Sequence, residues 1–105
     1  MEIAINDMGS TATVKLIGRL DIAGAASIDQ PLATLSGSKS GIVVDMTEVT
    51  FIASMGLRHL VSAAKAVRRR GGRLMLLNPS AEVAEVVMTS GLTEILPMER
   101  NTESG

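Results

Sequence analysis

The chain has 105 residues, of which 46% are hydrophobic and 20% are charged, and its formal net charge is −1. This composition predicts one globular domain with its own core, and the small net charge gives no general attraction to nucleic acid or to an anionic membrane. The sequence contains no Cys, Trp or Tyr, and it has one His and one Phe. These absences exclude disulfides, zinc–thiolate sites and aromatic base-stacking surfaces, so we expect no metal, no cofactor and no nucleic-acid ligand.

No apolar run approaches the roughly 20 residues that a transmembrane helix needs, so we expect no membrane insertion. The first seven residues also lack the basic start and apolar stretch of a signal peptide. The sequence therefore predicts a cytoplasmic protein. We expect residues 1–98 to form the domain and residues 99–105 to form a polar, disordered tail.

The beginning of the chain predicts a β-hairpin. Residues 2–6 and residues 11–17 are both rich in β-branched or apolar side chains, and residues 7–10 between them have turn chemistry around a glycine. The two strands of such a hairpin are antiparallel, so any sheet that they share with later parallel strands is mixed.

A helix is predicted next, beginning at Asp21 or Ala23, because apolar residues recur at roughly helical spacing as far as Leu35. Pro31 lies inside this helix, so its first turn or two are predicted to be irregular or kinked. Residues 36–41 consist of serine, glycine and one lysine, and they predict a loop.

Residues 42–46 are a short apolar run typical of a strand buried on both faces, and residues 47–53 lead from it into the strongest helical pattern of the sequence. Ser54 is the predicted N-cap of that helix. The helix is predicted to end at the glycine pair 71–72, after a last turn rich in arginine. Its apolar stripe consists of Leu57, Leu60, Val61, Ala64 and Val67.

Residues 73–77 predict another buried strand, and a further helix is predicted after Ser80, which acts as its cap, as far as residues 90–91. Residues 92–98 are expected to add a last edge strand or a short helix. The predicted fold class is therefore α/β. It is a single domain in which a mixed sheet opens with a hairpin and continues as alternating helices and strands.

Ser54 is the strongest candidate functional residue, because it stands where a strand unit gives way to a helix. One role for such a serine is to cap the helix by accepting a hydrogen bond from a backbone N–H. A second role uses the same geometry, because a phosphate here would meet free N–H groups and the positive end of the helix dipole. The residues alone leave both roles open.

Two other patterns predict less. The arginines and lysine within residues 65–73 are interpreted as a solvated helix end rather than as a nucleic-acid patch. A serine hydrolase would have to use Ser54, Asp21 and His59, but Ile52 replaces the first glycine of the Gly-x-Ser-x-Gly nucleophile elbow. We therefore predict that the protein is not an enzyme and has no catalytic residue.

Several landmarks, taken in order, resemble the STAS domains of the anti-sigma factor antagonist family. Residues 43–49 (Val-Val-Asp-Met-Thr-Glu-Val) and 51–57 (Phe-Ile-Ala-Ser-Met-Gly-Leu) resemble the signature region, and residues 18–21 (Gly-Arg-Leu-Asp) resemble the Gly-x-x-Asp element. Gly-Gly at 71–72 and Ser-Gly-Leu at 90–92 also fall where that family places them. The resemblance covers about residues 2–98.

The resemblance implies a protein switch. Family members bind a serine kinase that also sequesters a sigma factor, the kinase phosphorylates the first serine of an Asp-Ser-Ser/Thr-Gly pattern, and a PP2C-type phosphatase reverses this. Ser54 matches that serine, and Asp21 matches the acidic residue near it. Ala53 stands where many members have Asp, and Met55 replaces the second hydroxyl residue.

The resemblance implies that the unmodified chain docks on an anti-sigma factor or a related serine kinase and that phosphorylation of Ser54 releases it. The docking face would combine the loop at residues 18–25 with the helix start at residues 54–60. Because Ala53 replaces a carboxylate, the alternative is a non-phosphorylated scaffold subunit of a multi-protein assembly, for example one for lipid transport. The expected partner-binding residues are Asp21, Ala23, Met55, Gly56, Arg58 and His59.

Overall fold

Five strands form one sheet in the order β1-β2-β3-β4-β5 in the computed structural model, which describes residues 1–100. β1 and β2 are antiparallel, and the pairs β2–β3, β3–β4 and β4–β5 are parallel. The strands are β1 (Glu2–Asp7), β2 (Thr11–Leu20), β3 (Gly41–Ile52), β4 (Arg73–Leu77) and β5 (Met98–Glu99). The predicted mixed sheet with an N-terminal hairpin is therefore confirmed.

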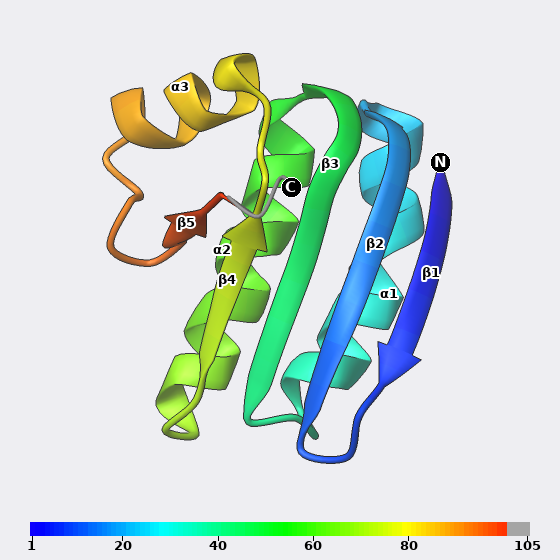
Figure 1. The fold of residues 1–105 in the computed structure, drawn as a ribbon, viewed down its shortest axis with the longest axis vertical. Coiled ribbons are helices and arrows are strands. Elements are labelled where there is room, and N and C mark those ends of the chain that lie inside the picture. The colour runs from blue at the N-terminus through cyan, green and yellow to red at the C-terminus, as the bar shows by residue number, and fades with distance from the viewer. Residues whose placement is uncertain (101–105) are drawn as a thin grey trace.

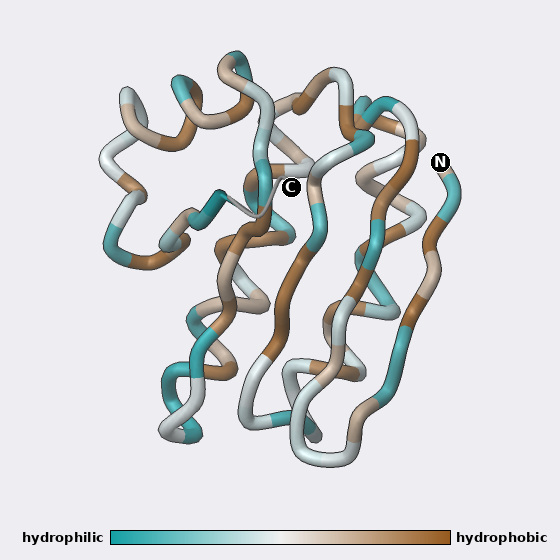
Figure 2. Tube along the Cα trace, viewed as in Figure 1, coloured by the Kyte–Doolittle hydropathy of each residue, from teal (hydrophilic) through white to brown (hydrophobic). Residues whose placement is uncertain are grey.

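Helices α1 (Ile22–Ser36) and α2 (Ser54–Arg69) cover one face of the sheet, and α3 (Ala81–Thr89) lies at one end of it beside β4 (Figure 1). The core between the sheet and the two long helices is closely packed. Buried side chains alternate along β2, and Figure 2 shows hydrophobic segments along β2, β3 and β4. The fully buried large side chains of the core include Leu16, Leu20, Ile28, Leu32, Val44, Met46, Leu60 and Leu76.

Helix α1 begins with a capped and regular first turn. The carboxylate of Asp21 accepts a hydrogen bond from the backbone N–H of Gly24 at 2.9 Å, so Asp21 is the N-cap, as one of the two predicted starts has it. The helix continues through Pro31 to Ser36, and the prediction of irregular or kinked first turns is wrong. Packing of the buried side of α1 outweighs the one backbone hydrogen bond that Pro31 lacks.

Strands β2 and β3 are longer than predicted. The second half of β3, as far as Ile52, pairs with residues 17–20 of β2, so residues 47–52 belong to the sheet and do not merely lead into α2. β4 pairs only with residues 41–45 of β3, which leaves the rest of that strand with one neighbour. This extension of β3 was not predicted, because the exposed polar residues Thr47 and Glu48 interrupt the apolar run.

The last helix and strand follow the prediction in outline. Ser80 caps α3, because its hydroxyl accepts a hydrogen bond from the Val83 N–H at 3.2 Å. β5 is an edge strand, and the Asn78 N–H donates to the Glu99 carbonyl at 2.7 Å. Glu99 thus belongs to the sheet, although it was predicted as the first residue of a tail. Of the rest of the predicted tail, Arg100 is exposed and lies outside any helix or strand, and residues 101–105 lie outside the described residues.

The sheet has two ends of different character. At the carboxyl end, β2, β3 and β4 finish and α1 and α2 begin, which is the upper end in Figure 1. At the turn end lie the hairpin turn at residues 8–10, the α1–β3 loop at residues 37–40 and the α2–β4 turn at residues 70–72. The carboxyl end contains Ser54.

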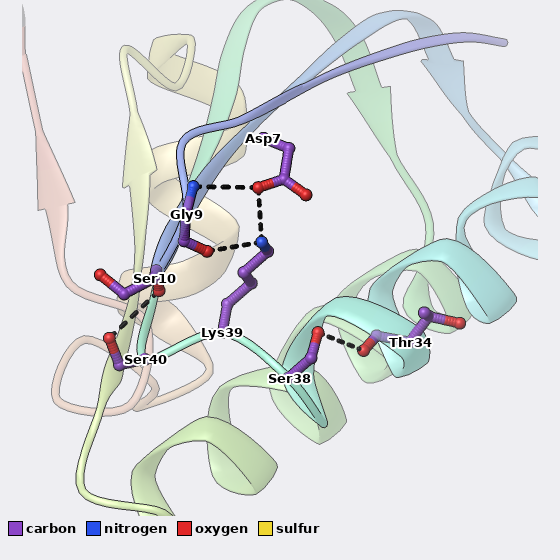
Figure 3. A network of polar contacts seen from close by, with 7 residues as sticks. All are labelled: Asp7, Gly9, Ser10, Thr34, Ser38, Lys39 and Ser40. Carbon is purple, nitrogen blue, oxygen red and sulfur yellow. Dashed lines mark hydrogen bonds and ion pairs between the residues drawn. The ribbon is translucent and has the colours of Figure 1, made fainter.

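Polar contacts join the hairpin turn to the α1–β3 loop at the turn end (Figure 3). The Lys39 ammonium is largely buried, and it donates to the Asp7 carboxylate at 2.5 Å and to the Gly9 carbonyl at 2.6 Å. The Arg70 guanidinium then donates to the carbonyls of Ser36, at 3.1 Å, and Lys39, at 2.7 Å. These bonds fix the end of α1, the end of α2 and the hairpin to one another.

Candidate functional site: the surface around Ser54

Ser54 is the first residue of α2, and its side chain is exposed at the carboxyl end of the sheet. The N-cap of α2 is Ala53, so the prediction that Ser54 caps this helix is wrong by one residue. The reason is that the Ala53 N–H still follows the sheet and donates to the Leu20 carbonyl at 2.9 Å. Within residues 1–100 the Ser54 hydroxyl makes no hydrogen bond, which leaves it free to be covered or modified.

Among residues 1–100, no side chain caps the start of α2, and the first turn of this helix contains no acidic residue. The first N–H groups of a helix have no carbonyl partner within it, and they carry the positive end of the helix dipole. An anion attached to Ser54 would therefore be stabilised by the helix that presents it.

Gly56 holds the start of α2 against the end of β2. The glycine is buried, and a Cβ at this position would lie 2.6 Å from Cγ of Leu20, closer than real Cβ contacts come. Gly56 therefore faces the core, although the sequence placed it among the partner-binding residues. Its contribution is to let the helix approach closely and so to fix the position of Ser54.

Asp21 and Ala23 lie at the start of α1, beside the end of β2. One carboxylate oxygen of Asp21 caps α1, and the other lies 3.9 Å from Nε of Arg19. The Arg19 guanidinium lies 4.5 Å from the centroid of the Phe51 ring, in the geometry of a cation–π contact. Ala23 is exposed. Asp21 is thus held by contacts within the chain, and its carboxylate remains partly accessible.

His59 faces α1 rather than the surface around Ser54. Its Nδ1 lies 3.4 Å from a carboxylate oxygen of Asp29 on α1, and its side chain is 20% exposed. A residue five positions further along a helix lies about 140° around its axis, so His59 and Ser54 are on different sides of α2. Ser54 and His59 therefore do not form the serine–histidine pair that a hydrolase at Ser54 would need.

Large apolar side chains are exposed at the same end of the sheet as Ser54, and most of them were not predicted as site residues. Ile22 is 77% exposed, Met55 41% and Phe51 39%. Met55 was among the predicted partner-binding residues, whereas Ile22 and Phe51 were not. The signals available were that Phe51 is the only aromatic residue and that Ile22 directly follows a capping aspartate, before the buried side of α1 begins.

A groove of about 620 Å³ runs beside Ser54, between the start of α2, the end of β3 and the α3 region. Its lining is mainly apolar, and Arg58 is the one lining residue with a charged side chain. The lining residues are Phe51, Ile52, Ala53, Ser54, Leu57, Arg58, Val61, Val86, Ser90 and Leu92. Ser54 and Arg58 were predicted as site residues, but the groove was not, because one of its walls comes from the α3 region.

Within residues 1–100, no group of three or more His, Asp or Glu side chains is arranged to hold a metal ion. The helices of this described part are all too short or too polar to cross a membrane. What remains at the carboxyl end is an unbonded hydroxyl surrounded by exposed apolar side chains.

Comparison with known proteins agrees with this geometry. The model of the STAS domain matches residues 2–105. The chain belongs to the STAS domain family. The anti-sigma-B factor antagonist of Listeria monocytogenes is 31% identical over 84 residues, which are 78% of this STAS chain and 73% of that protein.

Two solved structures of the anti-sigma factor antagonist SpoIIAA share the fold of this STAS chain. Its unphosphorylated form has a TM-score of 0.83 and 26% sequence identity, covering 97% of this chain and 90% of that one. Its phosphorylated form, from Bacillus, has a TM-score of 0.79 and 25% identity, covering 97% and 93%. The STAS-like fold expected from the landmarks is confirmed.

Proposed function

We propose that this STAS chain is an anti-sigma factor antagonist that acts by partner switching. The observation that carries the proposal is the exposed Ser54, which begins α2 without any hydrogen bond of its own among the described residues. Its relatives in Bacillus subtilis and Listeria monocytogenes are anti-sigma-B factor antagonists, and SpoIIAA has a phosphorylated form. A regulatory rather than a catalytic role agrees with the separation of Ser54 from His59 around α2.

In the unmodified state, an anti-sigma factor that is also a serine kinase docks on the carboxyl end of the sheet. Exposed Ile22, Phe51 and Met55 supply the apolar area that such a contact buries. Ala23 leaves room for close approach, and the partly accessible carboxylate of Asp21 offers an acceptor to a basic group of the partner. The Ser54 hydroxyl then lies beneath the partner.

Phosphorylation transfers the terminal phosphoryl group of ATP, which the partner kinase holds. The Ser54 Oγ attacks the γ-phosphorus, the bond from that phosphorus to the bridging oxygen breaks, and ADP leaves. The hydroxyl proton passes to a base on the kinase. Ala53 places no carboxylate beside the product, and the free N–H groups at the start of α2 stabilise its charge.

The phosphate carries a charge of about −1.5 to −2 at neutral pH, and it enters a contact that was largely apolar. A loss of 100-fold in affinity corresponds to about 2.7 kcal/mol, which a misplaced buried charge readily costs. Release follows from that cost. A PP2C-type phosphatase then hydrolyses the phosphoester with water, and the unmodified hydroxyl is restored.

The modification is tested by incubating the purified chain with its anti-sigma factor kinase and ATP and mapping the phosphate by mass spectrometry. We expect one phosphate on Ser54 and none on the Ser54→Ala variant. Ser62→Ala is the matched control, because Ser62 is exposed on the same helix two turns later. Clean modification of another residue, with Ser54 untouched, contradicts the assignment.

The switch is tested by titrating the same partner with variants of the unmodified chain. We expect Ser54→Ala to bind like the wild type, Ser54→Asp to bind about 100-fold more weakly, and Ser62→Asp to be unchanged. Equal affinities of the Ser54→Ala and Ser54→Asp variants would reject a charge switch. A stable complex without any phosphate would instead favour the scaffold role.

A further inference from the structure

Arg58 is a cation without a carboxylate partner among residues 1–100. Its side chain is exposed, and its one polar contact within these residues is a weak hydrogen bond from Nη1 to the sulfur of Met55 at 3.9 Å. Arg19, the other arginine near this surface, is already engaged with Phe51 and Asp21. An arginine fork pairs most strongly with a planar carboxylate or with a phosphate, so Arg58 is available for such an anion.

Arg58 and Ser54 belong to the same groove. Both residues line it, and they are separated by four positions on α2, which places them on one side of the helix. The other lining side chains carry no charge, and most are apolar. A complementary ligand therefore combines an apolar side chain, which enters the groove, with a carboxylate, which reaches Arg58.

We propose that Arg58 and the groove bind an acidic and apolar segment of the partner protein, and that phosphate on Ser54 ends this contact by pairing with Arg58 itself. The inference rests on the proposed function for the identity of the partner. It adds a mechanism for release, because the phosphate then competes with the carboxylate of the partner for one guanidinium. Without this competition, release would depend on repulsion and desolvation alone.

A protein segment fits better than a small ligand because the apolar surface does not stop at the groove. Phe51 lines the groove, and part of its side chain is exposed to solvent. The exposed side chains of Met55 and Ile22 lie at the same end of the sheet. A partner that fills the groove can cover these side chains in the same contact. A small amphiphile would leave them in water.

The proposed pairing has the favourable orientation for a helix. An anion four residues before a cation stabilises a helix, and the phosphate also lies at the positive end of the dipole. Phosphoserine offers three acceptor oxygens at about twice the charge of a carboxylate, so it competes well with a carboxylate of the partner. The guanidinium does not have to travel beyond the groove that it already lines.

The pairing is tested on the full chain with phosphoserine encoded at position 54, by following the second ionisation of the phosphate with ³¹P NMR at 0.15 M salt. We expect its pKa to rise by about half a pH unit, a threefold change in the ionisation constant, when Arg58→Gln removes the pairing. Lys65→Gln is the matched control, with the same change of charge on the same helix. Lys65 is about 16 Å along the axis from Ser54, beyond the screening length of about 8 Å.

A phosphate pKa that is the same in the Arg58→Gln chain and in the wild type overturns the proposal. This titration needs neither the kinase nor the anti-sigma factor, so it stands or falls separately from the proposed function. Failure of the unmodified chain to bind its anti-sigma factor would contradict the proposed function. The titration would still decide whether Arg58 pairs with the phosphate.

The groove is tested by affinity measurements with the anti-sigma factor. Val86→Asp puts a carboxylate into the groove, where it would repel the acidic segment of the partner. We expect this variant to weaken binding at least tenfold, whereas Met88→Asp should leave the affinity unchanged. Both residues are exposed on α3, but Met88 does not line the groove. Equal effects of the two variants would contradict a docked segment.

A double-mutant cycle connects the groove to the switch. Encoded phosphoserine at position 54 is expected to weaken binding by about 100-fold in the wild type but by less than about tenfold in the Arg58→Gln background, where the shared cation is already missing. If the losses of affinity caused by phosphoserine and by Arg58→Gln are additive, the proposed competition for Arg58 is overturned.

Discussion

The two ends of the sheet are built on opposite principles. At the turn end, the buried Lys39 and the exposed Arg70 donate to carbonyls and a carboxylate from several segments, so these polar groups are occupied within the chain. At the carboxyl end, Ser54 has no hydrogen bond among the described residues, and Ile22 and Met55 expose apolar surface. The contrast shows that stability is secured at one end so that the other can remain available to a partner.

The starts of the three helices show the same contrast. Asp21 caps α1 and Ser80 caps α3, each with a side-chain oxygen that accepts a backbone N–H. The cap residue of α2 is Ala53, whose side chain cannot accept a hydrogen bond. The helix that presents the candidate switch residue is therefore the one whose N–H groups are left for another acceptor.

Gly72→Ala should cause the largest damage to the turn end. A Cβ at Gly72 would lie 1.9 Å from the backbone oxygen of Ser40, and neither backbone can move without breaking the contact from Arg73 to that oxygen at 3.1 Å. We expect a loss of about 3 kcal/mol in the free energy of unfolding, measured in urea. Gly37→Ala is the control, since its Cβ would make ordinary contacts at 3.6 Å. Similar losses for both variants would contradict the steric account.

Lys39→Met should weaken the turn end by a smaller amount. Methionine keeps most of the apolar stem but loses the hydrogen bonds to Asp7 and to the Gly9 carbonyl. We expect a loss of about 1.5 kcal/mol in the free energy of unfolding. Lys65→Met, on an exposed position of α2, should change it by less than about 0.5 kcal/mol. An unchanged urea midpoint for Lys39→Met would mean that the contact does not stabilise the fold.

Two serines at helix starts should respond differently to replacement by alanine. Ser80→Ala removes the cap of α3 and should cost about 1 kcal/mol, whereas Ser54→Ala removes no hydrogen bond and should change stability by less than about 0.5 kcal/mol. Thermal and urea unfolding of the two variants measure this difference. A loss for Ser54→Ala as large as that for Ser80→Ala would show that Ser54 has a structural role.

The smallest expected effect is a change in the stability of the fold at acid pH, through the carboxyl group of Asp7. The Lys39 ammonium and the Gly9 N–H donate to Asp7 and lower the pKa of its carboxyl below the ordinary 3.8. Because the folded-state pKa is the lower one, this stabilisation is fully present above the unfolded value and is lost as the pH falls through the folded value. Asp7→Asn should therefore differ from the wild type above about pH 4.5 and converge with it at lower pH. Urea midpoints from pH 2 to 6 test this, and a difference that persists at the acid end would contradict it.

The order of strands and helices was predictable because each element has a periodic pattern and a local stop signal. Ser80 was predicted as a cap, and Asp21 as one of two possible starts of α1, because capping depends only on residues close in sequence. The end of β3 was not, because its pairing with β2 depends on contacts about 30 residues apart. The contact of Lys39 with Asp7, 32 residues apart, was hidden for the same reason.

The candidate site was predictable in its centre and not in its surroundings. The resemblance and the position at a helix start identified Ser54, and its exposure agrees with that assignment. The buried position of Gly56 was missed, although it lies four residues before Leu60 of the predicted apolar stripe and so on the same side of α2. The contact of His59 with Asp29 could not be predicted, because it depends on how α2 packs against α1.

The tight seating of Gly56 on Leu20 has a consequence for timing. Since α2 starts from a fixed support on β2, modification of Ser54 needs no slow rearrangement before the partner senses it. The delay between the arrival of the phosphate and the loss of the partner would then equal the lifetime of the bound pair. Under the switch proposed above, such a regulator would keep no record of its earlier state, and its output would follow the ratio of kinase to phosphatase activity from moment to moment.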